Sequence, residues 1–214
     1  MERPAIEPSA RLWVAPDFQS IAFGRQGEVL AAKVRLGITA LVSLIPIESL
    51  LLRTPGSEAR IGLGAAALAL AFGAVVLRLA KRPKPPAWLG LFTCLLDVST
   101  VSMVNVGFVL GGNPLAATNS RVVFCGYFVA LALVCLRQDR RWCLIAALAA
   151  MAEYGGIVLW AASRYDLRGA AFALSGYGRF VWDNQIARLM LLAAAGAIGA
   201  VIVVQSREIG RAHV

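Results

Sequence analysis

Histidine is almost absent from this chain, and the residue patterns that mark most enzymes are missing with it. The single histidine, His213, is next to the C-terminal residue, so no pair of histidines is available to ligate a haem and none can serve a catalytic triad deep in the chain. The sequence also lacks a phosphate-binding GxxxxGK[ST] loop, a GxSxG nucleophile turn and a zinc-binding HExxH helix. We therefore expect no catalytic site, no metal and no cofactor in these residues.

Charged residues are scarce as well, and apolar residues take their place. Asp, Glu, Lys and Arg make up 15% of the 214 residues, whereas hydrophobic residues make up 59% and the mean hydropathy is +0.71. A soluble domain carries about 25% charged and about 45–50% apolar residues. Because a folded chain in water must cover its surface with polar groups as well, this excess predicts an integral membrane protein.

The net charge of +9 does not indicate a nucleic-acid partner. The basic residues form short clusters between apolar runs, a distribution typical of membrane topology signals. Residues 1–33 lack the apolar centre of a signal peptide, so we expect the first span to direct insertion. The cysteines form no CxxC pair, and we expect buried free thiols rather than a disulfide framework or a zinc site. They are Cys94, Cys125, Cys135 and Cys143.

Six apolar runs predict helices that cross a hydrocarbon core of about 30 Å, which takes about 20 helical residues. A chain in lipid must satisfy its backbone internally, and these runs lack the alternation of a membrane barrel. The sequence therefore predicts an all-α fold, a bundle of six transmembrane helices within residues 34–204. The predicted spans are Val34–Leu52, Ile61–Leu79, Trp88–Leu110, Val122–Leu136, Trp142–Ala162 and Ile186–Val204. The fourth run is the shortest and can extend outward through Arg121, while Pro46 is the one interior break.

The distribution of Lys and Arg predicts that both chain ends lie in the cytoplasm. With the N-terminus inside, the inner segments carry twice as many of these residues as the outer ones, in agreement with the positive-inside rule. Residues 1–33 are then a cytoplasmic segment, in which residues 16–33 predict either an amphipathic helix on the inner leaflet or a partly ordered tail. Residues 205–214 begin a cytoplasmic linker. The expected location is a bacterial inner membrane.

Polar residues at membrane depth are the candidates for a functional site, because a charge at a helix centre costs about 2.5–3.5 kcal/mol on insertion scales. We expect a ligand pocket open to the outer side, with Arg188 or Arg121 as the anchor for a polar group. The candidate ligand-binding residues are Glu48, Asp97, Asn105, Arg121, Glu153, Tyr154, Trp182, Asp183 and Arg188. The alternatives are a structural lock, in which these groups pair with one another, for example Arg188 with Glu153 or Glu48, and an ion or proton path. Polar groups are expected to thin out toward the inner half.

Two further patterns predict how the helices pack and how the outer side is covered. Gly107 with Gly111, and Gly196 with Gly199 in a run of alanines, place small residues at spacings that permit close helix approach. The last helix is thus predicted at the bundle centre or at a dimer seam. Residues 163–185 form the longest outer connection, and their five aromatic residues predict a segment at the outer interface or folded over the bundle.

The last helix does not end in a polar tail but continues beyond its predicted span with a repeating pattern of residues. Ile202, Gln205, Ile209 and Ala212 recur at the spacing of a coiled-coil seam, which is typical of a linker that leads into a signalling output domain.

Six stretches resemble the N-terminal membrane region of bacterial nucleotide cyclases. They are Leu96-Asp97-Val98-Ser99, residues 119–124, residues 136–143, Glu153-Tyr154, residues 163–167 and residues 182–189.

The resemblance covers roughly residues 25–210. In that family a six-helix module precedes a GGDEF diguanylate cyclase domain or a class III adenylyl cyclase domain. The resemblance thus implies a sensor or anchor that places two cytosolic domains side by side. Such domains work in pairs, so the resemblance also implies a homodimer.

The sequence favours the membrane sensor and dimerisation domain of a bacterial signalling protein. It would sense a periplasmic or lipid-borne ligand and signal through its last helix. The expected partners are the lipid bilayer, a second copy of the chain, a small ligand and a cytoplasmic output domain after Val214, but no nucleic acid. A complete small channel or transporter is the alternative, and would show a polar stripe through the membrane, inverted repeats or broken helices. An anchor without a sensing role is a third alternative.

Overall fold

The computed structural model describes residues 18–52, 56–82, 86, 88–169, 172 and 176–212. Within these residues the chain forms helices and connecting turns, with no strand, so the predicted all-α class is confirmed. The helices in the described ranges are α1 (Phe18–Val42), α2 (Leu44–Leu52), α3 (Ser57–Ala80), α4 (Leu89–Leu110), α5 (Pro114–Asn119), α6 (Arg121–Cys135), α7 (Arg140–Arg164) and α8 (Trp182–Ala212).

Five of the described helical stretches are long and apolar enough to cross a membrane, as expected of a multi-pass membrane protein. They are Gly27–Leu52, Glu58–Ala80, Leu89–Leu110, Arg140–Arg164 and Trp182–Glu208. α6 is apolar but has only 15 residues. At 1.5 Å per residue it is about 22 Å long, short of a hydrocarbon core of about 30 Å.

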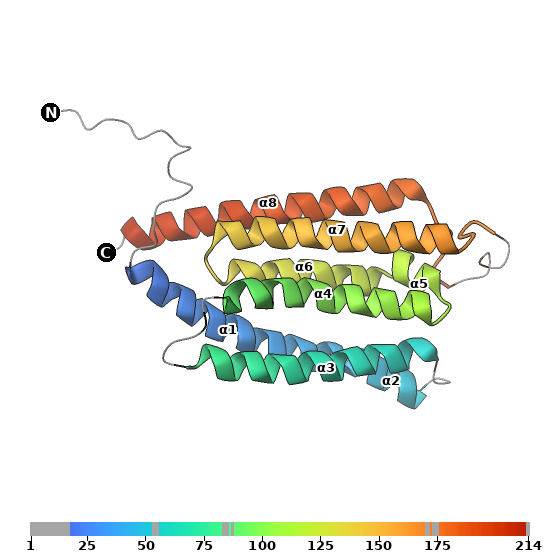
Figure 1. Ribbon diagram of the computed structural model, residues 1–214, viewed down its shortest axis with the longest axis horizontal. Helices are drawn as coiled ribbons and strands as arrows, with labels where there is room; N and C mark the ends of the chain where they lie inside the picture. Colours follow the sequence, from blue (N-terminus) through green and yellow to red (C-terminus); the bar gives the residue numbers. More distant parts are fainter. Residues whose placement is uncertain are drawn as a thin grey trace.

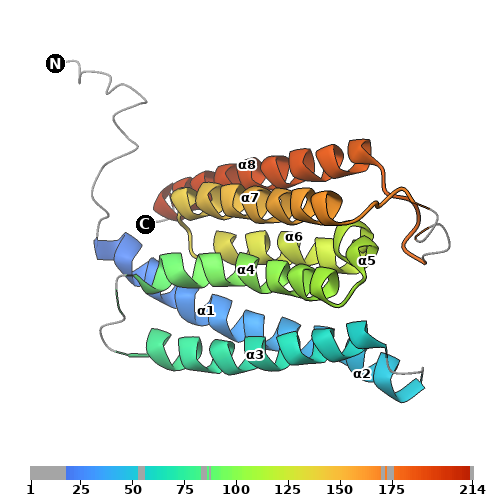
Figure 2. The same cartoon turned by 45° about the vertical axis from the view of Figure 1, so that its right-hand side comes forward.

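The long helices lie side by side along one axis (Figures 1 and 2). α4 and α6 lie between two outer pairs, α1 with α3 and α7 with α8. The short α5, α2 and the segment before α8 lie at one end, which we call the α5 end. The α6–α7 turn (residues 136–139) lies at the opposite end, with the start of α1 and the end of α8; we call this the turn end.

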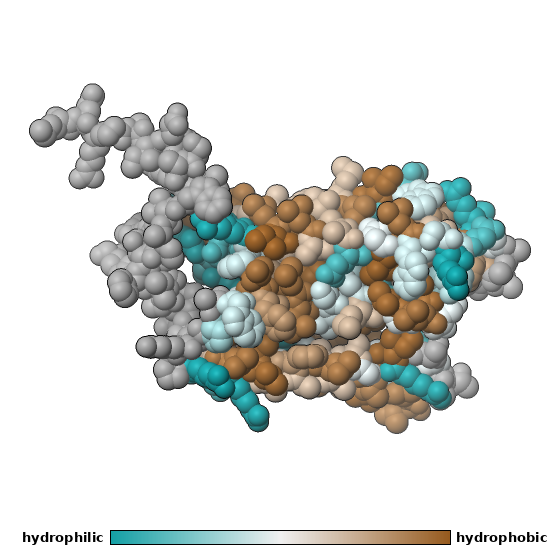
Figure 3. All heavy atoms as spheres, viewed as in Figure 1, coloured by the Kyte–Doolittle hydropathy of each residue, from teal (hydrophilic) through white to brown (hydrophobic). Residues whose placement is uncertain are grey.

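The surface of the bundle matches a lipid surrounding. On the face shown in Figure 3, apolar side chains occupy most of the middle, and hydrophilic side chains gather toward the two ends. Many large hydrophobic side chains are exposed in the single chain, for example Leu51, Leu110 and Met190. An exposed apolar band between polar ends is what a membrane-embedded bundle requires.

The helix of the first predicted span is interrupted close to Pro46, the residue at which the sequence predicts a break. α1 ends at Val42 and α2 begins at Leu44. Pro46 has no backbone N–H to donate to Val42, so the regular helical ladder is lost at this point. Ser43, between the two helices, donates its hydroxyl to the Ala40 carbonyl at 2.7 Å. The break thus has an identified cause in the sequence.

The two cytoplasmic segments predicted at the chain ends are helical where the structure describes them. α1 begins at Phe18 and continues without a break across residues 33 and 34. Near its start Gly27 is buried against the Leu136 carbonyl in the α6–α7 turn, so this part of α1 packs on the bundle. α8 continues to Ala212 as one helix. Residues 1–17 and 213–214 lie outside the described residues.

Short α5 accounts for the shortness of α6. Pro114 occupies its first turn, and the Asn113 side chain accepts a hydrogen bond from the Ala116 amide at 3.1 Å. The helix stops at Asn119, and Ser120 caps α6 by accepting from the Val123 amide at 3.3 Å. α6 therefore begins at Arg121, the outer limit predicted from sequence, and the buried α5 occupies the space beyond it.

Glycine permits close helix contacts at two of the positions that the small-residue spacing predicted. A Cβ at Gly107 would lie 2.7 Å from Ile61 Cγ2, so α3 lies directly against α4 there. A Cβ at Gly196 would overlap Ala147, so α8 lies directly against α7. α8 also packs on α6 but lies at the edge of the single-chain bundle. The prediction that the last helix occupies the bundle centre is therefore wrong for one chain.

Candidate functional site

The structure divides the candidate residues among three depths instead of joining them in one outer pocket. Asp97 lies toward the turn end, Asn105 and Glu153 lie in the middle, and Tyr154 and Arg188 lie toward the α5 end. The remaining candidates, Glu48, Arg121, Trp182 and Asp183, are exposed on the single chain and take part in no hydrogen bond or ion pair given for the described residues.

A buried group of four charges lies toward the turn end. Arg35 of α1 forms a two-pronged ion pair with Asp97 of α4, in which Nη2 donates to Oδ2 at 2.6 Å and Nε donates to Oδ1. Arg137 of the α6–α7 turn lies 3.7 Å from Asp97 Oδ2 through its Nη2 and 3.1 Å from Glu28 Oε1 through its Nε. We call Glu28, Arg35, Asp97 and Arg137 the charged cluster.

The charged cluster contradicts the expectation that polar groups thin out toward the inner half. Arg35, Asp97 and Arg137 are exposed to 6%, 8% and 3%. From sequence, Arg35 and Arg137 served only as topology-determining charges at helix ends, and Glu28 as part of a tail. Their partners come from three separate parts of the chain, so no local pattern could join them. Two acids and two bases cancel in charge, which makes the burial tolerable.

Hydrogen bonding within the charged cluster is incomplete. Arg137 Nη1 donates to the Gly90 carbonyl at 3.1 Å, which ties the turn to the start of α4. Glu28 Oε2, Arg35 Nη1 and Arg137 Nη2 are buried without a hydrogen-bond partner. Buried polar atoms normally find partners, so these three atoms leave the charged cluster incompletely hydrogen-bonded within the described residues.

Arg188 and Tyr154 meet toward the α5 end, where α5 ends and α6 begins. Arg188 Nη1 donates to the Tyr154 hydroxyl at 2.9 Å and to the Thr118 carbonyl, and Nη2 donates to the Asn119 carbonyl at 3.1 Å. The Tyr154 hydroxyl lies 2.5 Å from Gln185 Oε1 and 3.1 Å from the Thr118 oxygen. We call Thr118, Asn119, Tyr154, Gln185 and Arg188 the outer network.

The outer network explains how the Arg188 guanidinium is accommodated at membrane depth without a carboxylate partner. The carbonyls of the last residues of α5 have no partner within their own helix, and the cation lies at that negative end. The Arg188 guanidinium also lies 4.8 Å from the centroid of the Phe124 ring, a favourable cation–π distance. Arg188 is not paired with Glu153 or Glu48 in the described structure, so neither of the two pairs given as examples of the structural lock forms.

The two mid-depth candidates are engaged separately. Glu153 Oε1 accepts from the Ser99 hydroxyl at 2.7 Å, and its Oε2 is buried without a partner. Asn105 Nδ2 donates to the Tyr127 hydroxyl at 3.5 Å, and that hydroxyl lies 2.8 Å from Ser102 Oγ. These pairs join α4 to α6 and to α7, which makes them contacts between helices at the centre of the bundle.

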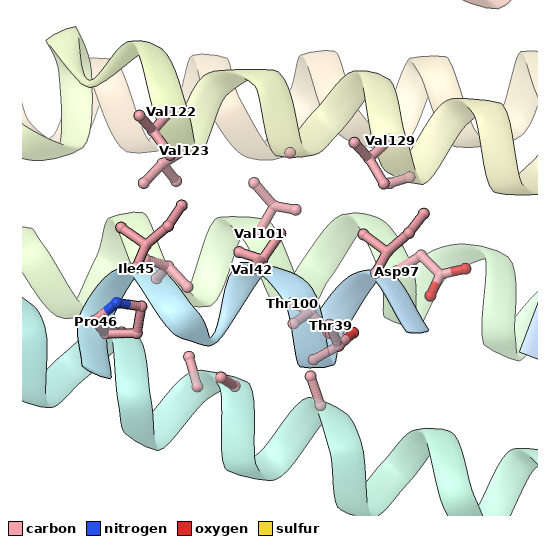
Figure 4. Close-up of a pocket in the computed structure, with 18 of the residues that line it drawn as sticks. Thr39, Val42, Ile45, Pro46, Asp97, Thr100, Val101, Val122, Val123 and Val129 are labelled. Atoms are coloured by element: carbon pink, nitrogen blue, oxygen red, sulfur yellow. The ribbon is translucent and has the colours of Figure 1, made fainter. Parts of the chain in front are cut away.

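A cavity of about 450 Å³ lies between the α1–α3 pair and α4 with α6. Figure 4 shows residues of α1, α2, α4 and α6 pointing into it, among them Val42, Pro46, Val101 and Val129. The middle of the cavity is lined by apolar and small side chains. Among the candidates predicted from sequence, Asp97 alone lines it. No local pattern indicates this cavity, because the small residues that line it, such as Ala66, fit a tightly packed helix interface equally well.

Each end of the cavity carries charge. Arg35 and Asp97 of the charged cluster contribute to its wall toward the turn end, and Glu58 and Tyr177 contribute toward the α5 end. Arg35 and Ser49 both line it, and their separation of 14 positions in the sequence corresponds to about 20 Å of helix at 1.5 Å per residue. The cavity is therefore elongated, apolar along its length and polar at its ends.

Glu58 anchors the segment that folds over the α5 end. Its carboxylate accepts from Asn113 Nδ2 and from the Tyr177 hydroxyl. Burial raises the pKa of the Tyr177 hydroxyl, and the hydrogen bond to Glu58 and the charge of that carboxylate raise it further. Asn119 Nδ2 donates to the Arg179 carbonyl at 3.1 Å, and Phe180 is buried. The described parts of this segment thus fold over the bundle, one of the two arrangements predicted.

Among the described residues, no group of three or more His, Cys, Asp or Glu side chains is placed to hold a metal ion. The arrangement offers instead an apolar cavity and two polar groups that join helices. No family model matches the chain, and no curated protein or solved structure shows a significant similarity to it.

Proposed function

We propose that this chain is the membrane-embedded sensory and dimerising domain of a bacterial signalling protein, and that it detects a lipid-borne ligand in the cavity between α1, α3, α4 and α6. The observation that carries the proposal is the cavity itself, which meets the charged cluster at one end. A volume of about 450 Å³ is within the range of small-molecule sites, about 300–1,000 Å³. Its apolar length of about 20 Å suits an acyl or isoprenoid chain.

The charged cluster supports a route from the cavity to the turn end. Arg35 and Asp97 line the cavity, and Asp97 lies within 3.7 Å of Arg137 in the α6–α7 turn. In this proposal the unpaired buried atoms give the cluster a second arrangement, and a ligand that fits the cavity in only one of the two would shift their populations. The turn leads into α7, and α8 packs directly on α7 at Gly196. α8 thereby carries the change to its extension beyond the bundle.

In this proposal the chain has six spans, with α6 and α5 together filling the fourth, and both ends in the cytoplasm. The resemblance to the membrane region of bacterial nucleotide cyclases supports a homodimer and a cyclase-type output domain after Val214. The continuation of α8 as one helix to Ala212 agrees with a signalling linker. A channel or transporter is favoured less, because the middle of the cavity is apolar and presents no polar stripe.

Binding in the cavity is tested with a fatty acid that carries a photoreactive diazirine and an alkyne, added to the protein in liposomes. We expect cross-links on peptides that line the cavity. Ala66→Phe should fill the space and reduce labelling several-fold. Ala67→Phe is the matched control, because Ala67 is the next residue, exposed and outside the lining. Equal labelling of the two variants, or labelling confined to the outer surface, would reject the cavity as a binding site.

Sensing is tested separately, with spin labels at Gln138 in the turn and Gln205 near the end of α8. We expect oleate to shift the distance distribution between the labels in the wild-type cavity and to leave it unchanged in Ala66→Phe. If the diazirine probe labels the cavity but oleate does not move the labels, the chain binds lipid without sensing it. That result would contradict the signalling part of the proposal and leave the binding part standing.

A further inference from the structure

We propose that Cys135 and Cys143 form a thiol pair that closes reversibly into a disulfide across the α6–α7 turn. Cys135 is the last residue of α6 and Cys143 is in the first turn of α7. Their sulfur atoms lie 3.8 Å apart. All four cysteines are free thiols in the structure. This proposal stands on the geometry of the pair and does not rest on the proposed sensing function.

The surroundings leave room for the two sulfur atoms and little else. Gly199 of α8 faces the pair, and a Cβ there would lie 2.8 Å from Cys135 Sγ and 3.8 Å from Cys143 Sγ. The thiols donate weakly to backbone carbonyls of Leu131 at 3.4 Å and Asp139 at 3.7 Å. Neither contact requires the sulfur atoms to stay apart. A disulfide needs an S–S distance of about 2.05 Å, and in this proposal rotation of the two side chains closes the present distance of 3.8 Å.

Exposure assigns different roles to the two thiols. Cys135 is half-buried, whereas Cys143 is exposed to only 1%. A small uncharged oxidant such as a peroxide therefore reaches Cys135 first. Reactivity of a thiol depends on access as well as on thiolate content, so Cys135 is the attacking residue and Cys143 the resolving residue.

The reaction is balanced with hydrogen peroxide as oxidant. The Cys135 sulfur attacks one peroxide oxygen, the O–O bond breaks, and the leaving hydroxide takes a proton to become water, which leaves a sulfenic acid. The Cys143 sulfur then attacks the Cys135 sulfur. The S–S bond forms, the S–O bond breaks, and the departing hydroxide takes the Cys143 proton. Two thiols and one peroxide thus give one disulfide and two waters, and a dithiol reductant reverses the change by exchange.

Closure of the disulfide would act on a strained turn. Gln138, between the two cysteines, has a φ of 58°, a left-handed conformation that non-glycine residues adopt at a cost. Arg137, also in this turn, is part of the charged cluster. A covalent bridge across residues 136–142 fixes the turn and restricts the arrangements open to Arg137. The thiol pair is thus placed to couple the redox state of the turn end to the buried charges.

The test uses a variant with Cys94→Ser and Cys125→Ser, so that only the pair remains, reconstituted in lipid nanodiscs. After treatment with hydrogen peroxide and unfolding in SDS, maleimide-linked polyethylene glycol should add no tags, and dithiothreitol should restore both. Adding Cys143→Ser should trap the sulfenic acid on Cys135, detected with dimedone. Circular dichroism and gel filtration of each variant establish that the protein remains folded.

Two outcomes would overturn the proposal. In the first, both tags persist at a peroxide concentration that oxidises the exposed Cys125 of the wild type. In the second, a variant with Cys125→Ser and Cys135→Ser loses its tags at a lower peroxide concentration than the pair-only variant, which would make Cys94 and not Cys135 the partner of Cys143 in the wild type. Cys94 is the relevant competitor because its sulfur lies 3.6 Å from the Trp142 carbonyl, beside Cys143.

Discussion

Arg35 and Asp97 join α1 to α4 through two hydrogen bonds between one guanidinium and one carboxylate, in a site where both side chains are less than a tenth exposed. The neutral variant Asp97→Asn leaves Arg35 and Arg137 buried with Glu28 as their one remaining counter-ion in the charged cluster. We expect a loss of about 3–5 kcal/mol in the free energy of unfolding, typical of a broken buried pair. SDS titration of the protein in mixed micelles measures it.

The double variant Arg35→Leu with Asp97→Leu separates charge from packing. Because it removes both partners and leaves neither charge unpaired, we expect it to be more stable than Asp97→Asn. We expect this even though Arg137 of the turn then keeps only Glu28 as its partner. Glu48→Gln is the matched control for an acid in a span, since Glu48 is exposed on α2, and it should leave unfolding unchanged. If Asp97→Asn unfolds like the wild type, the charged cluster contributes nothing to stability.

The Tyr154 hydroxyl is the centre of the outer network, so Tyr154→Phe should affect several partners at once. The variant leaves Gln185 Oε1 and one donor of Arg188 without their present partner. Unpaired buried groups cost about 1–3 kcal/mol each, and inter-helical hydrogen bonds in membranes are at the lower end of that range. We expect a loss of about 1 kcal/mol or more in the SDS titration. Arg121→Gln, at an exposed position on α6, is the control and should show no loss.

The sequence predicted the elements of this fold more readily than its sites, and Pro46 shows why. The lack of an N–H is a property of one residue, so the position of the break between α1 and α2 follows from local chemistry. The same is true of Gly107 and Gly196, whose missing Cβ atoms fix close helix contacts wherever the partner comes from. Apolar runs likewise located five helices long enough to span, because length and hydropathy are local, although the first begins at Gly27 instead of Val34 and the fourth run forms the 15-residue α6.

Arg35, Arg137 and Arg188 show what local patterns cannot give. Each of these cations lies near the end of a predicted span, where sequence reasoning assigns it to water or to an acid. In the structure two of them turn inward to Asp97, and the third binds backbone carbonyls freed by the break at Ser120. The one available signal was the Asn113-Pro114 start and Ser120 stop of a short helix, which leaves carbonyls in need of a donor. The cavity left no signal of its own.

Tyr177 predicts a dependence of stability on alkaline pH. Its pKa in the folded state is raised above the ordinary value of about 10, so the unfolded chain loses this proton first as pH rises. The stabilisation is therefore fully present below pH of about 10 and is lost as pH climbs toward the folded-state pKa. Thermal unfolding of the wild type and of Tyr177→Phe should differ most at neutral pH and converge above pH of about 10. A difference that stays constant or widens would contradict the contact with Glu58.

The close contact at Gly196 predicts that one added methyl group would force α7 and α8 apart. A Cβ at this position would overlap Ala147 Cβ and lie 3.5 Å from the Cys143 carbonyl oxygen, so Gly196→Ala must push the two helices apart. We expect a loss of about 1–3 kcal/mol, the usual cost of overpacking, despite the better helix propensity of alanine. Gly156→Ala is the control on α7, because no atom lies within 4 Å of its added Cβ, and it should be neutral or slightly stabilising. If both variants behave alike in SDS titration, α8 is not held against α7 at this distance. The route from the cavity to the end of α8 would then lack its last contact.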